Sequence, residues 1–425
     1  MRSPLTSELL AASRLTQSGR LSEATAALQR MLGRAVPRRT NVPYGPLTID
    51  GVADAAESAT GPAANAPLTF GAGIGRQPSD SAEPTRPRTQ PAALRSLLDP
   101  ARHDRLPLPS GGLAQLRPRP APVAVPDGAK FLAATFSGTA GNRPYRLYVP
   151  RSYNGQPVPL IVMLHGCTQS PDDFAAGTRM NEAAEQHTCL VAYPEQIGSA
   201  NLQRCWNWFR EGDQQRDAGE PSLIAGITRE VMRDYAVDPQ RVYVAGLSAG
   251  GAAAAIMGEA YPDLYAAIGV HSGLACGAAR DMPSAFAAMQ GGTPDFGHRA
   301  GGSTRSGMRP RVIPAIVFHG DGDTTVHPRN GDAVVAQSAQ FAELMAHNAA
   351  GWVPGGHAYH CTRYVDANGQ TMIEQWVIHG AGHAWFGGSP AGSYTDPRGP
   401  DATAEMVRFF LEHPHPPADN PLADS

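Results

Sequence analysis

The sequence has no uninterrupted apolar run of the roughly 18 or more residues that a membrane-spanning helix requires. Charge of one sign is not in excess either, because 35 Lys and Arg stand against 38 Asp and Glu, for a net charge of -3. A nucleic-acid-binding protein is usually strongly basic, so this balance argues against that class. Glu8 and Arg14 interrupt the N-terminal apolar positions, which do not form a secretory signal. We expect no transmembrane segment and, by default, a cytoplasmic protein.

Cysteine is also scarce, with five in 425 residues and none in a C-x-x-C pair. This number and spacing imply neither a zinc site nor a disulfide framework. We therefore expect free thiols, no metal and no other cofactor. One bridge between Cys167 and Cys205 remains an alternative, because both lie in loops that we place near the active site.

Proline, in contrast, is abundant but concentrated, with 16 of the 39 prolines between residues 35 and 126. Such a composition cannot bury enough apolar surface to offset the entropy of ordering, so we expect residues 36–129 to be a largely disordered linker. Residues 1–35 show helical periodicity and predict a short helical segment. Residues 414–425 are expected to be a disordered tail.

Residues 130–413 have a different pattern, in which short apolar stretches alternate with helical stretches. This alternation predicts one α/β domain with a doubly wound, mostly parallel sheet that is covered on both faces. The expected strands are Tyr145–Val149, Leu160–Leu164, Leu190–Tyr193, Val242–Ala245, Ala267–Val270, Ala315–Phe318 and Met372–Ile378. The expected helices are Asp172–His187, Pro221–Tyr235, Ala249–Tyr261, Asp332–Asn348 and Asp401–Leu411.

A serine nucleophile is indicated by Gly246-Leu247-Ser248-Ala249-Gly250, which matches the pattern G-x-S-x-G. A β-branched stretch precedes the pattern and an alanine-rich stretch follows it, as expected for a sharp turn from a strand into a helix. The two glycines leave room where strand and helix approach each other. We therefore predict that Ser248 projects above the sheet as a nucleophile.

An oxyanion hole requires backbone amides that already point at the carbonyl oxygen on which negative charge develops. One such amide is expected from Ala249, directly after the nucleophile. We assign the other to Cys167, in the turn His165-Gly166-Cys167 after an apolar stretch, and keep Gly166 as the alternative.

The nucleophile also needs a base, and the base needs a carboxylate that orients it. Asp321 and Asp323 both follow the expected strand that ends at Phe318. The spacing G-x-x-D-x-x-V selects Asp323 as the acid and makes Asp321 a turn residue. His383 lies in the glycine-rich loop after the last expected strand, where the chain order Ser, Asp, His places the base.

Six separate motifs in the same region carry a resemblance to a known family. The chain resembles the polyhydroxybutyrate (PHB) depolymerase family of esterases, which belongs to the α/β-hydrolase superfamily. The resemblance covers about residues 131–413. The motifs are LHGCTQ (164–169), CWNWF (205–209), GLSAGG (246–251), HSG (271–273), HGDGD (319–323) and GHAWFGG (382–388).

The resemblance implies an α/β-hydrolase fold with Ser248, Asp323 and His383 as a catalytic triad and no metal. It also implies polyester, aryl ester or acyl ester substrates, and many members of the family are extracellular, which is the alternative to a cytoplasmic location. Aromatic side chains in the expected active-site loops further predict substrate contacts. The predicted substrate-binding residues are Trp206, Trp208, Trp385, Asn207 and His165.

Three functions are compatible with these motifs. We favour a serine esterase that hydrolyses poly(3-hydroxyalkanoate), such as polyhydroxybutyrate, or its oligomers. A feruloyl, acetylxylan-type or short-chain carboxylesterase is the alternative within the same chemistry. A granule-binding scaffold with a non-catalytic hydrolase fold is an alternative of another class, and residues 1–35 are a candidate for attachment to a polymer granule in either case.

Overall fold

The computed structural model describes residues 123–291 and 312–416. The helical segment expected at residues 1–35 and most of the expected linker lie outside these ranges. The described residues do include the whole region in which the sequence predicts an α/β domain, apart from residues 292–311. All six family-like motifs therefore have a described structure.

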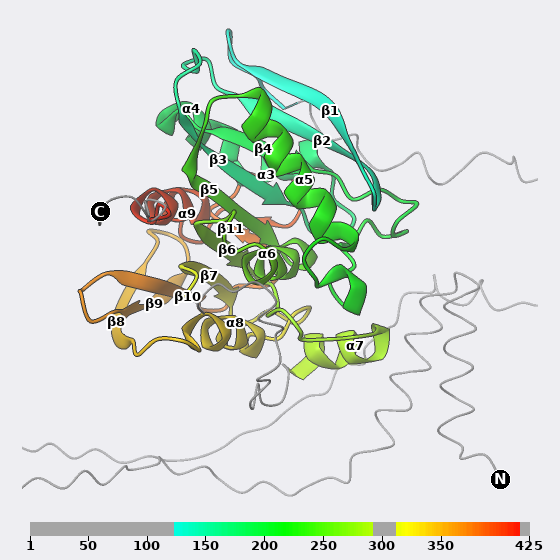
Figure 1. The fold of residues 1–425 in the computed structure, drawn as a ribbon. Coiled ribbons are helices and arrows are strands. Elements are labelled where there is room, and N and C mark those ends of the chain that lie inside the picture. The colour runs from blue at the N-terminus through cyan, green and yellow to red at the C-terminus, as the bar shows by residue number, and fades with distance from the viewer. Residues whose placement is uncertain (1–122, 292–311, 417–425) are drawn as a thin grey trace, which may run out of the picture. The chain divides into compact units, whose positions relative to one another are not determined.

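A ten-stranded mixed sheet forms the centre of the domain, in the order β1-β2-β4-β3-β5-β6-β7-β10-β9-β8 (Figure 1). The middle of the sheet, from β4 to β10, is parallel, while the strands at both edges pair antiparallel. The sheet strands are β1 (Lys130–Gly138), β2 (Gly141–Val149), β3 (Val158–Leu164), β4 (Leu190–Pro194), β5 (Val237–Leu247), β6 (Ala267–His271), β7 (Ala315–Gly320), β8 (Met345–Trp352), β9 (Ala358–Val365) and β10 (Thr371–Ile378). The short strands β11 (Trp385–Phe386) and β12 (Thr395–Asp396) form a separate pair.

The central strands are apolar on both faces, because each face is covered by helices. In β3, Leu160 and Val162 join one hydrophobic core, while Ile161 and Met163 join a second core on the opposite face. This alternation follows from the two-residue period of a strand.

Helices cover each face of the sheet (Figure 1). Buried residues of α5 (Gly219–Asp234), α6 (Ala249–Ala260) and α8 (Arg329–Ala339) belong to the first core. Those of α3 (Pro171–Thr178), α4 (Met180–His187) and α9 (Ala402–Glu412) belong to the second. The turn η3 (Glu211–Asp213) precedes α5, and α7 (Met282–Gly291) lies between β6 and β7. The sequence prediction of a doubly wound, mostly parallel sheet is thus confirmed.

Several elements differ from the sequence prediction. The helix expected over Asp332–Asn348 ends at Ala339, and Met345–Trp352 forms the edge strand β8. The helix expected over Asp172–His187 is two helices, because Arg179 between them has the left-handed φ of 56°. The sequence did not predict β1, β9 or α7.

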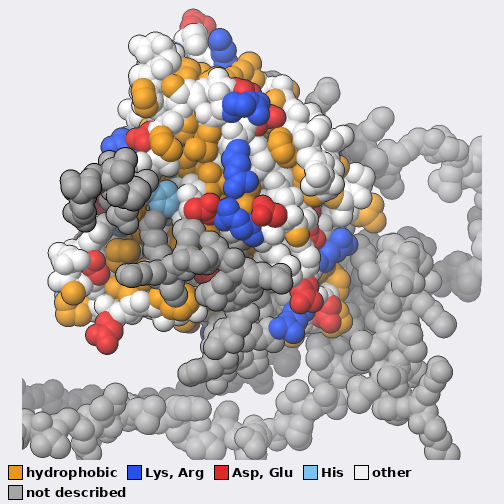
Figure 2. All heavy atoms as spheres, in the orientation of Figure 1, with side chains coloured by type: hydrophobic (Ala, Val, Ile, Leu, Met, Phe, Trp, Pro, Cys, Tyr) orange, Lys and Arg blue, Asp and Glu red, His pale blue; other side chains and the backbone are white. Residues whose placement is uncertain are grey.

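Many charged side chains on the described surface lie next to partners of opposite sign. On the face in Figure 2, arginines and acidic residues alternate and do not form a broad patch of one charge. Arg216, for example, contacts Asp263 and Arg146 contacts Asp172. Within residues 123–291 and 312–416, no helix has the length and apolar character needed to cross a membrane.

Candidate active site

Ser248 occupies a sharp turn between β5 and α6. Its φ of 58° and ψ of -119° are rare for a residue with a side chain. The strain is maintained by close packing, because a Cβ on Gly250 would lie 1.9 Å from the Leu164 carbonyl oxygen and one on Gly246 would lie 2.3 Å from the Gly250 carbonyl carbon. Only glycine fits at these two positions, as the strand-turn-helix prediction requires.

Asp323 and His383 form a hydrogen-bonded pair at the carboxyl-terminal edge of the sheet. Nδ1 of His383 donates to Oδ2 of Asp323 at 2.7 Å. Asp321, the competing acid, instead accepts from Nδ1 of His379 at 2.8 Å and is exposed. The structure therefore pairs Asp323, the predicted acid, with His383, the predicted base. Asp321 belongs to a separate pair on the surface.

The environment of Asp323 keeps its carboxylate ionised. Burial would raise its pKa, but hydrogen bonds from His319, His383 and the Val326 amide outweigh burial and hold the pKa well below its usual range. The amides of Thr325 and Val326 donate to Oδ1 at 2.8 and 2.9 Å, which leaves Oδ2 for the histidines. A charged, oriented carboxylate of this kind stabilises an imidazolium on His383.

His271 connects the turn of Ser248 to the loop that carries His383. Its carbonyl oxygen accepts from the Ser248 amide at 2.8 Å, and its Nε2 accepts from the Phe386 amide at 3.1 Å. Burial lowers the pKa of His271 well below its usual value, so the ring is a neutral acceptor. The strand β6, which His271 ends, separates β5 from β7 and thereby sets the spacing between Ser248 and Asp323.

The loop after β3 lies against Ser248. A Cβ placed on Gly166 would be 3.7 Å from the Cβ of Ser248. The Gly166 amide donates to the side chain of Gln169 at 2.8 Å and is therefore engaged. Among the described residues, nothing accepts a hydrogen bond from the Cys167 amide. Of the two amides considered from the sequence, the structure thus leaves that of Cys167 available.

The second expected donor, the Ala249 amide, belongs to the first residue of α6. The first amides of a helix have no acceptor within the helix, and they lie at the positive end of its dipole. The Ala249 amide is therefore suited to an oxyanion.

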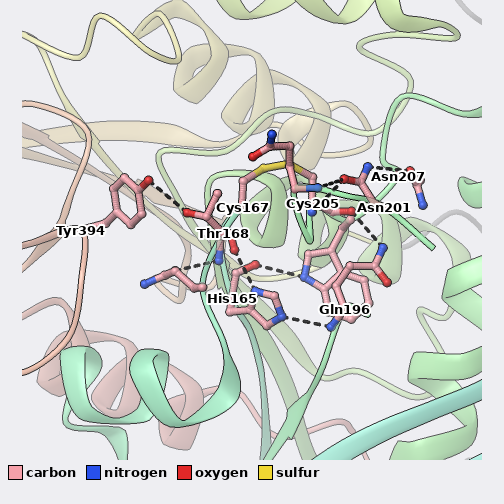
Figure 3. Close-up of a disulfide and its surroundings, with 12 residues drawn as sticks. His165, Cys167, Thr168, Gln196, Asn201, Cys205, Asn207 and Tyr394 are labelled. Atoms are coloured by element: carbon pink, nitrogen blue, oxygen red, sulfur yellow. Dashed lines mark hydrogen bonds between the residues drawn. A yellow bond between two sulfur atoms is a disulfide. The ribbon is translucent and has the colours of Figure 1, made fainter. Parts of the chain in front are cut away.

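Cys167 and Cys205 form a disulfide, which joins the loop after β3 to the loop after β4 (Figure 3). The expectation of free thiols is wrong for this pair, because the fold brings the two Cα atoms to 4.2 Å although 38 positions separate them in the sequence. Cys189, Cys276 and Cys361 are free.

The structure buries the five side chains predicted to bind substrate. Trp206 is 0% exposed, and its Nε1 donates to the His165 carbonyl at 3.0 Å. Asn207 donates to Glu220, while the Nε1 of Trp385 donates to Thr403. Trp208 and the His165 ring are buried as well. These contacts support the loops from within, so none of the five presents an exposed surface to a substrate in this conformation.

Two exposed apolar side chains next to the site were not found from the sequence. The hydroxyl of Tyr394 lies 3.2 Å from that of Thr168, directly after Cys167. The carbonyl of Tyr394 accepts from the Trp385 amide, two residues after His383. Leu202 lies beside Gln203, whose carbonyl accepts from the Thr168 amide. Tyr394 is 46% and Leu202 91% exposed. Neither is part of a motif, so only the fold reveals their position.

Comparison with known proteins identifies relatives of the same chemistry. The family model described as "Esterase PHB depolymerase" matches residues 143–359, about half of the chain. The matched range contains Ser248 and Asp323 and ends before His383.

Two curated relatives are depolymerases. Poly(3-hydroxyalkanoate) depolymerase C of Paucimonas lemoignei is 33% identical over 259 residues, which cover 59% of this chain and 60% of that protein. Poly(3-hydroxybutyrate) depolymerase of Ralstonia pickettii is 28% identical over 260 residues, which cover 58% of this chain and 51% of that protein. The chain thus spans between half and two thirds of the length of these relatives.

A solved structure, acetyl xylan esterase from Aspergillus awamori, has the same fold. It superimposes with a TM-score of 0.52 at 20% sequence identity, and the match covers 67% of this chain and 99% of the other. Together with the sheet order and the helical layers described above, this likeness confirms the α/β-hydrolase fold.

Proposed function

The chain belongs to the PHB depolymerase family of esterases, and from this we propose that it hydrolyses the ester bonds of poly(3-hydroxyalkanoate) or of its oligomers. The observation that supports this proposal best is the Asp323–His383 pair, which lies on the same sheet edge as the strained Ser248 turn. An acid, a base and a nucleophile in this arrangement form the catalytic unit of a serine esterase.

In the proposed first half-reaction, the Oγ of Ser248 attacks the ester carbonyl while its proton passes to Nε2 of His383. The amides of Cys167 and Ala249 hold the resulting oxyanion, and Asp323 stabilises the imidazolium. The tetrahedral intermediate then collapses, the alcohol leaves with the proton from His383, and an acyl-enzyme remains.

In the second half-reaction, His383 takes a proton from water, and the hydroxide attacks the acyl-enzyme. The same amides hold the second oxyanion. Ser248 leaves with the proton returned by His383, and a 3-hydroxy acid or a shortened oligomer is released.

We assign the contact with a polyester chain to Tyr394 and Leu202, in place of the tryptophans. Both are exposed and apolar. Tyr394 contacts Thr168 in the loop after β3, residues 165–170, which we call the oxyanion loop. Leu202 lies beside Gln203, which accepts a hydrogen bond from the same loop. Exposed apolar side chains beside a polar catalytic group suit a substrate that alternates hydrocarbon and ester groups.

The disulfide also bears on the location. Bridges of this kind persist in oxidising compartments and are rare in the cytoplasm, so we propose the extracellular address over the cytoplasmic one.

A substrate panel tests the proposal. Turnover is measured on soluble 3-hydroxybutyrate oligomers, methyl ferulate, acetylated xylan and p-nitrophenyl butyrate, with products identified by mass spectrometry. We expect the highest kcat/KM among the natural esters on the oligomers. A clear preference for methyl ferulate or acetylated xylan would assign the other esterase class, and no turnover on any ester would favour the non-catalytic scaffold.

A further inference from the structure

A buried carboxylate that the proposed reaction does not use lies behind the oxyanion loop. Glu220, the second residue of α5, accepts hydrogen bonds at 2.7 Å from both the backbone and the side-chain amide of Asn207. It also accepts from the side chain of Gln196, and Arg143 lies 3.9 Å away. Burial raises the pKa of Glu220, and the hydrogen bonds from Asn207 and Gln196 oppose this effect. Donors therefore face this carboxylate from three different segments.

Gln196, which donates to Glu220, also contacts both loops that the disulfide joins. Figure 3 shows its hydrogen bonds to His165 and Cys205. Its backbone amide donates to Nε2 of His165 at 3.0 Å, and its side-chain amide donates to the carbonyl of Cys205 at 2.9 Å. The oxygen of its side chain accepts from Arg143. Gln196 is fully buried, and its backbone amide, side-chain amide and side-chain oxygen all have hydrogen-bond partners. These contacts fix the position of the side chain.

His165 connects Gln196 to the loop that carries the proposed oxyanion donor. Because its Nε2 accepts from Gln196, its Nδ1 carries the proton and donates to the Gly166 carbonyl at 2.8 Å. The Gly166 carbonyl and the Cys167 amide belong to one planar peptide unit. A hydrogen bond that fixes the carbonyl therefore also fixes the direction of the Cys167 N–H, and it polarises the peptide toward a stronger donor.

A second route from Glu220 reaches the same loop. Asn207, held by Glu220, directly follows Trp206, whose Nε1 donates to the His165 carbonyl. Cys205, before Trp206, is bonded to Cys167 itself. This second route ends on the His165–Gly166 peptide and on the side chain of Cys167, which flank the Gly166–Cys167 peptide that the first route orients.

We propose that Glu220 is a positioning residue for the oxyanion hole, and that it acts through Gln196, Asn207 and His165 on the Gly166–Cys167 peptide. The inference rests on the proposed function, because it assumes that the Cys167 amide stabilises the tetrahedral intermediates. Under this proposal, Glu220 has a specific effect on kcat although its carboxylate has no access to substrate.

The test compares Glu220→Gln with the wild-type enzyme on p-nitrophenyl butyrate. The substitution keeps the shape of the side chain but turns one acceptor oxygen into an NH2 group that faces other donors. We expect kcat to fall roughly 10- to 100-fold, which is no more than the fall in kcat on removal of an oxyanion-hole donor. We expect KM to change by less than about threefold. Inhibition by an alkyl boronic acid, whose adduct is tetrahedral, should weaken in the same proportion.

Glu374→Gln is the matched control. Glu374 in β10 is also buried and accepts from the Nε1 of Trp376 at 3.0 Å, and it pairs with Arg408, but it lies toward the opposite end of the sheet from the site. We expect this variant to lose thermal stability while kcat and boronate inhibition stay unchanged. An equal loss of kcat in Glu374→Gln would show a general effect of buried carboxylates and would overturn the inference.

Gln196→Met removes the side-chain contacts with Glu220 and with the Cys205 carbonyl, while the carboxylate and the backbone amide that donates to His165 remain. This variant decides the question if Glu220→Gln does not fold. A wild-type kcat in the folded Glu220→Gln or Gln196→Met protein also overturns the inference. Its failure is separable from that of the proposed function, because a wild-type kcat in these variants leaves the esterase activity intact, whereas the proposed function is contradicted by the substrate panel or by an active Ser248→Ala protein.

Discussion

At the scale of single residues, His165 shows how burial can assign a role that the sequence does not. The sequence suggests a histidine that contacts substrate, whereas the structure encloses its ring and uses both nitrogens within the protein. Burial lowers its pKa to about 4 from the usual 6.5. The ring is therefore neutral at neutral pH, as its two hydrogen bonds require.

This lowered pKa predicts a pH dependence of stability. Between pH 6.5 and about 4 the unfolded chain binds a proton at His165 that the folded chain does not, so the free energy of unfolding falls as the pH falls through this window, by about 3 kcal/mol in full. In His165→Asn this contribution is absent. Urea unfolding at pH 7 and pH 4.5 should show a smaller difference in the variant, and equal differences would contradict the assignment. His271 contributes equally to both proteins and cancels in the comparison.

The positions of Ser248, Asp323 and His383 just past the ends of β5, β7 and β10 could be predicted from the sequence, because their motifs directly follow the apolar stretches that form these strands. The roles of Trp206 and Asn207 could not, because burial depends on the packing of loops that are far apart in the sequence. The position of Tyr394 next to the site could not be predicted for the same reason, because it contacts Thr168, which lies 226 positions away in the sequence.

At the scale of elements, the turn from β5 into α6 is the part of the fold with the least steric freedom. Gly250→Ala would place a Cβ 1.9 Å from a backbone oxygen of β3, which cannot move without shifting the central sheet. We expect loss of esterase activity and a stability loss of several kcal/mol, about that of severe overpacking.

Gly258→Ala provides the control for this prediction. Gly258 lies in the same helix, so the gain in helix propensity is the same, but its Cβ would meet side-chain methyl groups and no backbone atom, the nearest being Cγ2 of Ile268 at 2.9 Å. Activity and the thermal midpoint, measured side by side, should change far less in Gly258→Ala. An active, folded Gly250→Ala protein would show that the turn is less constrained than described.

The disulfide is a second constraint on an element, the oxyanion loop. Breaking it with Cys205→Ser removes the closure of a 38-residue loop, which corresponds to up to about 4 kcal/mol of stability in the chain-entropy account. It also frees the segment that carries Cys167, so we expect a lower kcat and a lower urea midpoint. Cys276→Ser, at a free cysteine, should change neither quantity. A Cys205→Ser enzyme with wild-type kcat would contradict the idea that the disulfide holds the oxyanion loop in place.

The incorrect helix boundary at residue 339 has a physical explanation. The sequence of β8 is MAHNAAGW, which lacks β-branched residues and contains alanines typical of helices. Pairing with β9 decides its conformation, and no local signal reports that pairing. Central strands such as β3 and β5 were predictable because burial on both faces forces a continuous apolar run.

At the scale of the whole molecule, the described domain contains every residue that the proposed mechanism uses. A protein that lacks residues 1–122 should therefore keep the wild-type kcat/KM on soluble esters. Co-sedimentation with native polymer granules should fall if residues 1–35, the candidate for this role, attach the enzyme to its substrate. Unchanged co-sedimentation would contradict that role, and loss of activity on soluble esters would show that these residues support the domain.

The first strand of the described domain, β1, begins at Lys130, close to where the proline-rich stretch ends. The carboxyl-terminal limit was less sharp. The amide of His415 donates to the carbonyl of Gln240 at 2.7 Å, so the domain extends past His413, where apolar periodicity stops. Backbone contacts of this kind leave no trace in the sequence.

The central claim is that Ser248 is the nucleophile of an ester hydrolase, and Ser248→Ala tests it most directly. Hydrolysis of p-nitrophenyl butyrate and of 3-hydroxybutyrate oligomers is measured for both proteins, with circular dichroism to compare their folding. We predict that the folded variant loses at least about a thousandfold in kcat/KM, because it lacks the hydroxyl that forms the acyl-enzyme in the proposed mechanism. A folded Ser248→Ala protein with wild-type turnover would contradict the account.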